Sequence, residues 1–434
     1  MDRPVAVRSV RLDPPEFRAL FQALDRPRFV WAGDTRTTVA GGAAATITAN
    51  GPGRFETVRE QARELFSGFQ QIESEVPLRP RLYGGFSFTD THVDPGAGRT
   101  WEGYPGALFI LPAVEASRTA DGCWLTTTAT GPEAVDRARE RLEDWCERAS
   151  DLPPVHSSQS PGVVDRSYAP PLADWQQEIE EATDRIKQGK LQKVVLAQAL
   201  TATLSEPIDP ATVLDRLGES YPDCFRFLFE PETGGAFFGA TPERLVSVEG
   251  TELTTEALAG SIGRGDTTTE DEWLATQIRE SEKNNHEHDI VVETIREQLA
   301  GLTEEITTGS RIVRKLANVQ HLQTPIRATL DADRHVLELV QALHPTPAVG
   351  GLPPGTALET IRETEVFERG WYAAPVGWID ADGNGTFAVA IRSALASGRK
   401  ATLFAGAGIV ADSDPDEEWD ELQLKYRPIL DELG

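Results

Sequence analysis

Four stretches lie close together in the last quarter of the chain: HPTPAVGGLP (344–353), FAVAIRSA (387–394), FAGAGIV (404–410) and SDPDEEWDELQLK (413–425). The first three are rich in small residues, and all but the third contain charged or polar side chains. Small residues leave room for a ligand, and glycines let backbone N–H groups approach it closely. Together the four stretches indicate a binding site for a small polyanion. Taken singly, each is also compatible with an ordinary core strand or a solvated helix face.

Arg392 is the cation that this pattern singles out. A strand over FAVAIRSA puts it on one face with Ala388, Ala390 and Ala394. A planar guanidinium beside such small neighbours suits two-point binding of a carboxylate. The sequence therefore predicts that Arg392 holds an anionic group of a ligand.

The SDPDEEWDELQLK stretch predicts a helix. Ser413 is a suitable N-cap, and Pro415 fits the first helical position. Glu421 and Lys425, four residues apart, then share one face of that helix. The interpretation as a solvated Glu–Lys pair remains open at this point.

Composition excludes several classes of protein. With 434 residues and 39% hydrophobic residues, the chain can bury a sizeable core. It has no apolar run long enough for a membrane span, and MDRPVAVRSV (1–10) lacks the pattern of a signal peptide. The widely spaced Cys123, Cys146 and Cys224 form neither a disulfide framework nor a zinc site. We therefore expect a cytoplasmic protein.

The charge balance is strongly acidic. A net charge of −27 argues against nucleic acid as a partner. Only seven of the 42 basic residues are lysines, and the 69 acidic residues are spread along the chain. Dense carboxylate with little lysine is typical of proteins adapted to molar salt, where screening suppresses self-repulsion. Any lysine in an apolar setting is therefore notable.

Lys193 is such a lysine. An amphipathic helix is predicted over 172–188, followed by a buried strand, KVVLAQALTATL (193–204), that begins with this residue. At the end of a strand Lys193 could simply extend its ammonium group to solvent. Alternatively, burial disfavours the charged ammonium form, as a general base requires.

A long helix is predicted over 271–300, and it contains HEH (286–288). Two histidines two residues apart point to different faces of a helix, so they cannot share a zinc ion. A single carboxylate, Glu287, combined with Glu421 from the C-terminal helix suits magnesium, which takes few carboxylates and keeps several waters.

These stretches carry a family resemblance. The chain resembles the chorismate-utilising enzymes, and within that group the isochorismate synthases. The resemblance is strong over about 170–434 and weak before it, chiefly at YGGFSF (83–88). Besides the four opening stretches, it rests on KVVLAQ (193–198), GATPERL (239–245), TEALAG (255–260), SEKNNHEHDIVV (281–292) and QHLQTPI (320–326).

The resemblance implies an α+β fold with two large packed antiparallel β-sheets and helices on the outside. It also implies a single chorismate-binding domain over 1–434, although a Pro/Ser-rich loop at 152–162 could otherwise separate two domains. The strands expected after 376 follow one another without helices, which fits this architecture.

The resemblance also assigns roles. Lys193 would be the base that activates water for attack on C2 of chorismate, and Glu243 the acid that protonates the departing C4 hydroxyl. Mg²⁺ would be held by Glu287 and Glu421. The place of Glu418, one helical turn before Glu421, suits a ligand that acts through a water. The implied substrate-binding residues are Gly260, Ser261, His321, Ala348, Tyr372, Arg392, Gly406 and Lys425.

Two positions depart from the family pattern. Gln198 stands where arginine is usual, and Asn284–Asn285 replace an acidic–basic pair before HEH. Neither position is one of the implied catalytic residues.

The expected function is therefore that of a magnesium-dependent isochorismate synthase. The expected partner is chorismate, and we expect a monomer or a weak homo-oligomer. Salicylate synthase, which adds pyruvate elimination, remains an alternative, as does a less favoured anthranilate or aminodeoxychorismate synthase large subunit. A non-enzymatic binding protein would not need both Lys193 and Glu243. The sequence does not show whether the product would serve menaquinone or siderophore synthesis.

Overall fold

The computed structural model describes residues 4–12, 16–33, 35–74, 79–155 and 159–434. Within these residues the strands form one hydrogen-bonded network. The strands are β1 (Val5–Leu12), β2 (Arg28–Ala32), β3 (Thr37–Ala49), β4 (Phe69–Ser74), β5 (Arg81–Phe86), β6 (Ala107–Thr119), β7 (Gly122–Thr130), β8 (Val163–Ala169), β9 (Lys193–Leu204), β10 (Phe225–Glu230), β11 (Ala236–Thr241), β12 (Arg244–Glu249), β13 (Glu252–Gly263), β14 (Thr303–Thr308), β15 (Ile312–Lys315), β16 (Val319–Leu330), β17 (Gly351–Leu352), β18 (Pro375–Asp380), β19 (Gly385–Val389), β20 (Ser393–Ser397) and β21 (Lys400–Ile409).

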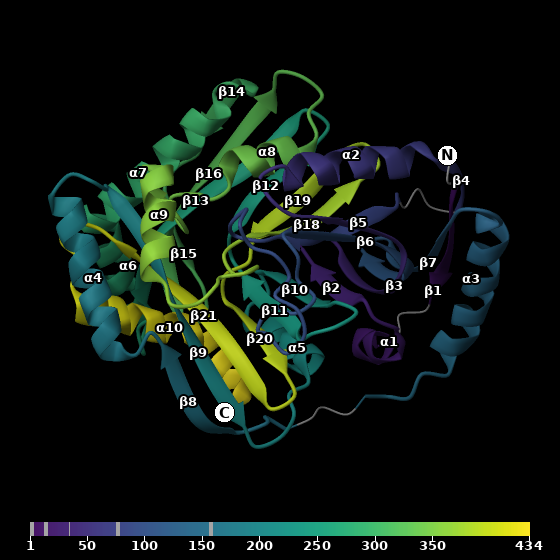
Figure 1. The fold of residues 1–434 in the computed structure, drawn as a ribbon, viewed down its shortest axis with the longest axis horizontal. Coiled ribbons are helices and arrows are strands. Elements are labelled where there is room, and N and C mark those ends of the chain that lie inside the picture. Colours follow the sequence, from purple (N-terminus) through teal and green to yellow (C-terminus); the bar gives the residue numbers. More distant parts are fainter. Residues whose placement is uncertain (1–3, 13–15, 34, 75–78, 156–158) are drawn as a thin grey trace.

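Helices lie on the outside of the strands (Figure 1). They are α1 (Phe17–Ala23), α2 (Arg54–Ser67), α3 (Ala134–Ser150), α4 (Leu172–Lys187), α5 (Pro210–Ser220), α6 (Thr268–Glu280), α7 (Glu282–Leu299), α8 (Val336–Leu343), α9 (Pro354–Thr364) and α10 (Pro415–Leu433). The helix predicted over 172–188 is confirmed as α4, which buries Trp175, Ile179, Ala182 and Ile186 at helical spacing.

The network has two arms that meet at β3. One arm runs through β2, β10, β11, β20, β21, β9 and β8. The other runs through β6, β5, β18, β19, β12, β13 and β16. Nearly all neighbouring strands are antiparallel; β1 and β4 form a parallel pair. The predicted antiparallel architecture is confirmed, and its two sheets are the arms of one network.

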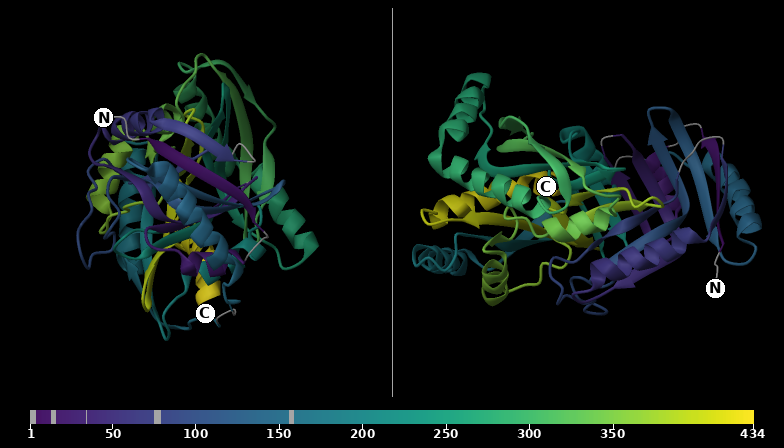
Figure 2. Two further views of the ribbon diagram at one scale, coloured as in Figure 1. Left: turned by 90° about the vertical axis from the view of Figure 1, so that its right-hand side faces the viewer. Right: turned by 90° about the horizontal axis from the view of Figure 1, so that it is seen from above.

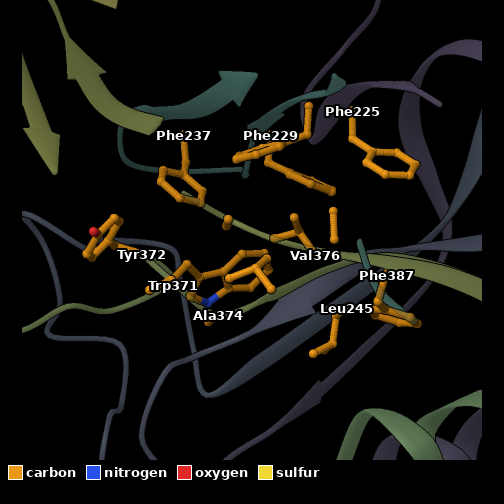
Figure 3. Close-up of a cluster of buried hydrophobic side chains, with 14 of the residues drawn as sticks. Phe225, Phe229, Phe237, Leu245, Trp371, Tyr372, Ala374, Val376 and Phe387 are labelled. Carbon is orange, nitrogen blue, oxygen red and sulfur yellow. The ribbon is translucent and has the colours of Figure 1, made fainter. Parts of the chain in front are cut away.

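Aromatic side chains fill the space between the arms. In Figure 3, Phe229 and Phe237 of the first arm face Val376 and Phe387 of the second. The ring of Phe29 in β2 lies 4.8 Å from that of Tyr83 in β5, across the same interface. Alternate residues of each strand point into this core.

Both halves of the sequence contribute strands to the network. Figure 2 shows the N-terminal elements at one end of the molecule and most of the later elements at the other. The Pro/Ser-rich loop predicted at 152–162 connects α3 to β8, and residues 156–158 of it lie outside the described residues. No helix within the described residues is long and apolar enough to cross a membrane.

The long helix predicted over 271–300 is wrong, because two helices occupy this region. α6 ends before Ser281, whose backbone is extended (ψ 117°). The Ser281 side chain accepts a hydrogen bond from the backbone N–H of Asn284 and so caps the start of α7. This break reorients α7, which carries Glu287.

The predicted cap of the C-terminal helix is also corrected. Asp414, rather than Ser413, is the N-cap of α10, and its carboxylate accepts hydrogen bonds from the N–H groups of Asp416 and Glu417. The Ser413 hydroxyl instead accepts from the N–H of Val410, just after β21. Pro415 does begin the helix, as predicted.

FAVAIRSA is not one continuous strand. β19 ends at Val389 and pairs with β12 and β18 in one arm, whereas β20 begins at Ser393 and pairs with β11 and β21 in the other. The chain therefore crosses between the two arms at Arg392, which has a left-handed φ of 52°. Such a conformation costs a non-glycine residue about 1–2 kcal/mol, so the surrounding structure must hold it in place.

Candidate active site

A cavity of about 500 Å³ lies between α7, α10 and the ends of the central strands. Every residue that the sequence analysis assigned to the site lines this cavity, apart from Lys193, which is buried beside it. The lining residues among them are Glu243, Gly260, Ser261, Glu287, His321, Ala348, Tyr372, Arg392, Gly406, Glu418, Glu421 and Lys425. Residues from distant parts of the chain thus meet at one place.

Lys193 is completely buried at the start of β9. Its Nζ donates a hydrogen bond to Glu287 Oε1 over 2.7 Å. A Cβ at Gly408 would lie 2.9 Å from that carboxylate oxygen and 3.1 Å from Lys193 Cε. Glycine at this position therefore leaves room for the pair. The alternative that Lys193 extends to solvent at a strand end is wrong.

Glu243 follows β11 after a Thr-Pro turn and is 5% exposed. Burial, with a smaller contribution from the neighbouring Glu256, raises the pKa of Glu243 to about 8, although Arg392, Lys193 and Lys425 oppose the shift. The carboxyl is therefore largely protonated at neutral pH. A protonated carboxyl in a cavity can donate a proton to a leaving group.

Arg392 and His321 form a connected polar pair. Arg392 Nη2 lies 3.3 Å from His321 Nε2. A guanidinium can only donate, so Nε2 accepts and Nδ1 carries the proton. That N–H can donate to Gly260 O, 3.1 Å away, or to Ser261 Oγ at the same distance. Burial and then Arg392 lower the pKa of His321 to about 3, so the ring stays neutral and holds Arg392 in place.

Three carboxylates at the cavity each have a lysine partner. Besides Lys193–Glu287, Lys425 Nζ lies 2.7 Å from Glu421 Oε1, and Lys283 Nζ lies 3.3 Å from Glu418 Oε1. Burial, followed by the charge of Glu421, raises the pKa of Glu418. For Glu421, burial acts in the same direction, but Lys425 outweighs it and the pKa is lowered. Three of the chain's seven lysines thus serve this one region.

These carboxylates suit a magnesium ion. Mg²⁺ takes oxygen ligands, commonly one or two carboxylates together with waters and substrate oxygens. Within the described part of the chain, no three His, Cys, Asp or Glu side chains are grouped closely enough to hold a metal by themselves. The donor set therefore fits an ion shared with a substrate better than a fully enclosed structural metal.

Tyr372 and Lys425 complete the wall around Gly406. The Tyr372 ring stacks on Phe404 with centroids 5.2 Å apart, and burial raises the pKa of its hydroxyl. Lys425 Nζ donates to Gly406 O over 2.6 Å. A Cβ at Gly406 would lie 3.2 Å from the Tyr372 hydroxyl oxygen, so glycine keeps this part of the cavity open.

Sequence reasoning missed three charged residues near the cavity. Lys283 lines it and pairs with Glu418. Arg369 also lines it and forms an ion pair with Glu365, and both side chains are 3% exposed. The scarcity of lysine could have drawn attention to Lys283. Glu365 and Arg369 gave no such signal, because charges four residues apart are usually exposed.

The fold and the cavity together define a chorismate-binding enzyme. The model of the family described as "Chorismate binding enzyme" matches residues 4–434, and the chain belongs to that family.

Its relatives include proteins named for one activity. The chain is 37% identical to isochorismate synthase MenF of Bacillus subtilis, over 94% of this chain and 88% of that protein. It is 36% identical to the salicylate biosynthesis isochorismate synthase of Pseudomonas aeruginosa, over 100% of this chain and 91% of that protein. The structure of MenF, the menaquinone-specific isochorismate synthase from Escherichia coli, superposes with a TM-score of 0.83 at 26% identity and covers 99% and 95% of the two chains.

Proposed function

We propose that this protein is an isochorismate synthase that converts chorismate to isochorismate. The observation that carries the proposal is the meeting of a buried lysine and a glutamic acid with a raised pKa at one cavity. An isomerisation that moves a hydroxyl group needs a base at one carbon and an acid at another. Relatives named isochorismate synthase, which match over nearly the whole chain, support the assignment.

The two residues divide the reaction between them. Lys193, in its neutral form, takes a proton from water as the water oxygen bonds to C2 of the ring. Both ring double bonds shift, from C1=C2 to C1=C6 and from C5=C6 to C4=C5, and the C–O bond at C4 breaks. Glu243 donates its proton to the departing hydroxyl, which leaves as water. One water enters and one leaves, so the product is an isomer of the substrate.

The cations and the backbone hold the substrate. Arg392 is 7% exposed and faces the cavity, where it would bind the enolpyruvyl carboxylate through two N–H groups. Gly260, Ser261 and Gly406 would offer backbone or hydroxyl groups, while His321, Ala348 and Tyr372 would shape the ring pocket. Lys425 would add a second positive charge for a dianionic substrate.

Glu287 and Glu421 would hold Mg²⁺ directly, and Glu418 through a water. Bound there, the ion would supply positive charge to the ring carboxylate of chorismate. Lys193 and Lys425 lie beside these two carboxylates, each with its Nζ 2.7 Å from a carboxylate oxygen.

We further propose that the chain acts as one chorismate-binding unit, because its strands form a continuous network from both halves. We expect the protein to act in the cytoplasm as a monomer or a weak homo-oligomer. Its product would serve menaquinone or siderophore synthesis, and relatives include a MenF and an enzyme of salicylate biosynthesis.

Product analysis tests the proposed activity. The purified protein is incubated with chorismate and MgCl₂, and the products are separated by chromatography. We expect isochorismate to accumulate toward equilibrium with chorismate, with no pyruvate. Salicylate with stoichiometric pyruvate would instead identify a salicylate synthase, and anthranilate formed only when ammonia is added would identify an amine-transferring relative. An Arg399→Lys variant, changed at a 60% exposed arginine, serves as the active control.

A further inference from the structure

The edge of β9 that faces away from β21 has a gap between two partner strands. β17 pairs with the start of β9 as far as Val194, and Val195 N donates to Gly350 O over 2.8 Å. β8 pairs with β9 only from Ala199 onward. Backbone groups between these two partners need hydrogen bonds from elsewhere, because an unpaired buried amide is costly.

Glu365 and Arg369 fill this gap with side chains. Arg369 Nη2 donates to Val195 O over 2.7 Å, and Glu365 Oε1 accepts from Ala197 N over 2.9 Å. The cation thus meets a carbonyl and the carboxylate meets an N–H, as the polarity of the strand edge requires. Arg369 Nε also donates to Glu365 Oε2 over 2.9 Å. The ion pair takes the place of a neighbouring strand.

The same guanidinium reaches the loop that contains HPTPAVGG. Arg369 Nη1 donates to Val349 O over 2.8 Å. Val349 follows Ala348, and both line the cavity. The guanidinium of Arg369 also lies over the Phe88 ring, 4.3 Å from the ring centroid. Arg369 therefore joins the strand that begins with Lys193 to the loop that forms part of the cavity wall.

Val195 connects this contact to Lys193. It lies two residues further along β9, on the same face of the strand as Lys193, and it lines the cavity. A shift of the strand relative to the loop would therefore move Lys193 relative to a substrate resting on Ala348. A displacement of about 1 Å between reacting groups can cost about a hundredfold in rate.

We propose that Glu365 and Arg369 are positioning residues that fix the distance between Lys193 and the bound substrate. The inference rests on the proposed role of Lys193 as the base. A buried ion pair contributes little net stability compared with apolar residues of the same volume, so a role in geometry accounts for its place at the cavity wall better than a role in stability.

The first test compares two arginine-to-lysine variants. Arg369→Lys keeps the charge but cannot reach two carbonyls and a carboxylate together. We expect its kcat to fall about 10- to 100-fold, with the KM for chorismate changed less than about threefold. Arg427→Lys is the control, because Arg427 and Asp431 also lie four residues apart, with exposures of 57% and 60%. Its kcat should be unchanged. A normal kcat for Arg369→Lys, or a change confined to KM, would overturn the proposal.

A double-mutant cycle separates positioning from general structure. If Arg369 acts through Lys193, adding Arg369→Lys to Lys193→Ala should lower the residual activity no further. A residue needed only for folding would lower it again, and that result would overturn the proposal. The Lys193→Ala variant by itself tests the proposed function. If it kept full activity, Lys193 would not be the base, and this conclusion would not depend on Arg369.

Glu365→Gln provides a second variant should Arg369→Lys be insoluble. Glutamine keeps an oxygen for Ala197 N but loses the charge that holds Arg369. We expect a smaller fall in kcat, about 3- to 10-fold, which again disappears in the Lys193→Ala background. A soluble Glu365→Gln protein with unchanged kcat would contradict the proposal.

Discussion

Carboxylates on the surface and carboxylates at the cavity have different surroundings. On α4, Glu180, Glu181 and Asp184 lie exposed together on one face. At the cavity, the carboxylates of Glu287, Glu418 and Glu421 each have a lysine Nζ within 3.3 Å. Water stabilises the first group, whereas the second is partly or wholly removed from water and is stabilised by a cation.

This difference shows that amino-acid composition describes the surface of the protein better than its cavity. The net charge of −27 describes a surface that interacts with solvent and salt, and it says little about the cavity. The chain has few lysines, yet three of them pair with buried or partly buried carboxylates at the cavity. We therefore expect changes at the cavity to alter catalysis, and changes of salt to alter stability.

The largest effect is expected from Lys193→Ala. Loss of a positioned base typically costs about 10²–10⁴ in rate. Chorismate binding should change little, since Arg392 and Lys425 remain. Turnover with chorismate and Mg²⁺ is measured beside Lys190→Ala, which removes an exposed lysine three residues earlier. Near-normal turnover of Lys193→Ala would show that its burial serves only packing.

Arg392→Lys should impair the enzyme although the charge is kept. Lysine cannot reproduce two-point binding of a carboxylate, nor the contact with His321 Nε2. The expected loss is about 1.5–3 kcal/mol, as for hydrogen bonds to charged groups. The KM for chorismate is compared with that of Arg399→Lys. A value within twofold of the parent would mean that Arg392 only packs.

The position of Arg392 also shows what the sequence could not predict. Its neighbours indicated one strand, whereas the structure breaks the strand at Arg392, which lines the cavity. The crossover between the two arms depends on pairing with β12 and β11, which are distant in sequence. A local pattern contains no information about such partners. The cap at Ser281 was also missed, although serine is a favoured N-cap residue and could have indicated a helix start there.

Lys193 and Arg369 illustrate the same limit. A rare lysine heading an apolar strand was a local signal that left burial and exposure both open, and the structure buries it. Glu365 and Arg369 have the spacing of an exposed pair, so only the gap between β17 and β8 explains their burial. Residues that support the cavity through backbone contacts are therefore harder to predict than those that line it.

The activity should fall as the pH rises above about 8. Burial raises the pKa of Glu243 to about 8, and the acid must be protonated to act, so its working form is lost above that pH. We expect kcat/KM to fall up to tenfold per pH unit on this alkaline limb. The measurement is kcat/KM from pH 6 to 10 at saturating Mg²⁺. A steady rise through pH 9.5 would exclude Glu243 as the acid.

Removing either proposed magnesium ligand should raise the magnesium requirement several-fold. Glu287→Gln and Glu421→Gln each remove one carboxylate, and their combination should be far from additive because both serve one ion. Activity is titrated against MgCl₂, with Glu297→Gln, an exposed glutamate of α7 away from the cavity, as control. Unchanged half-saturation in both single variants would refute a shared site.

The smallest effect concerns the surface. With 69 acidic and 42 basic residues, repulsion between carboxylates opposes the compact state. At 1 M salt the Debye length is about 3 Å, against about 10 Å at 0.1 M, so this repulsion is largely screened. Screening also weakens the attraction of a dianionic substrate to Arg392 and Lys425, but those groups are enclosed and are screened less. We therefore expect the melting temperature to rise from 0.1 to 2 M KCl, and activity to rise with it before levelling. A melting temperature that stays flat or falls would mean that the surface charge is no adaptation to salt.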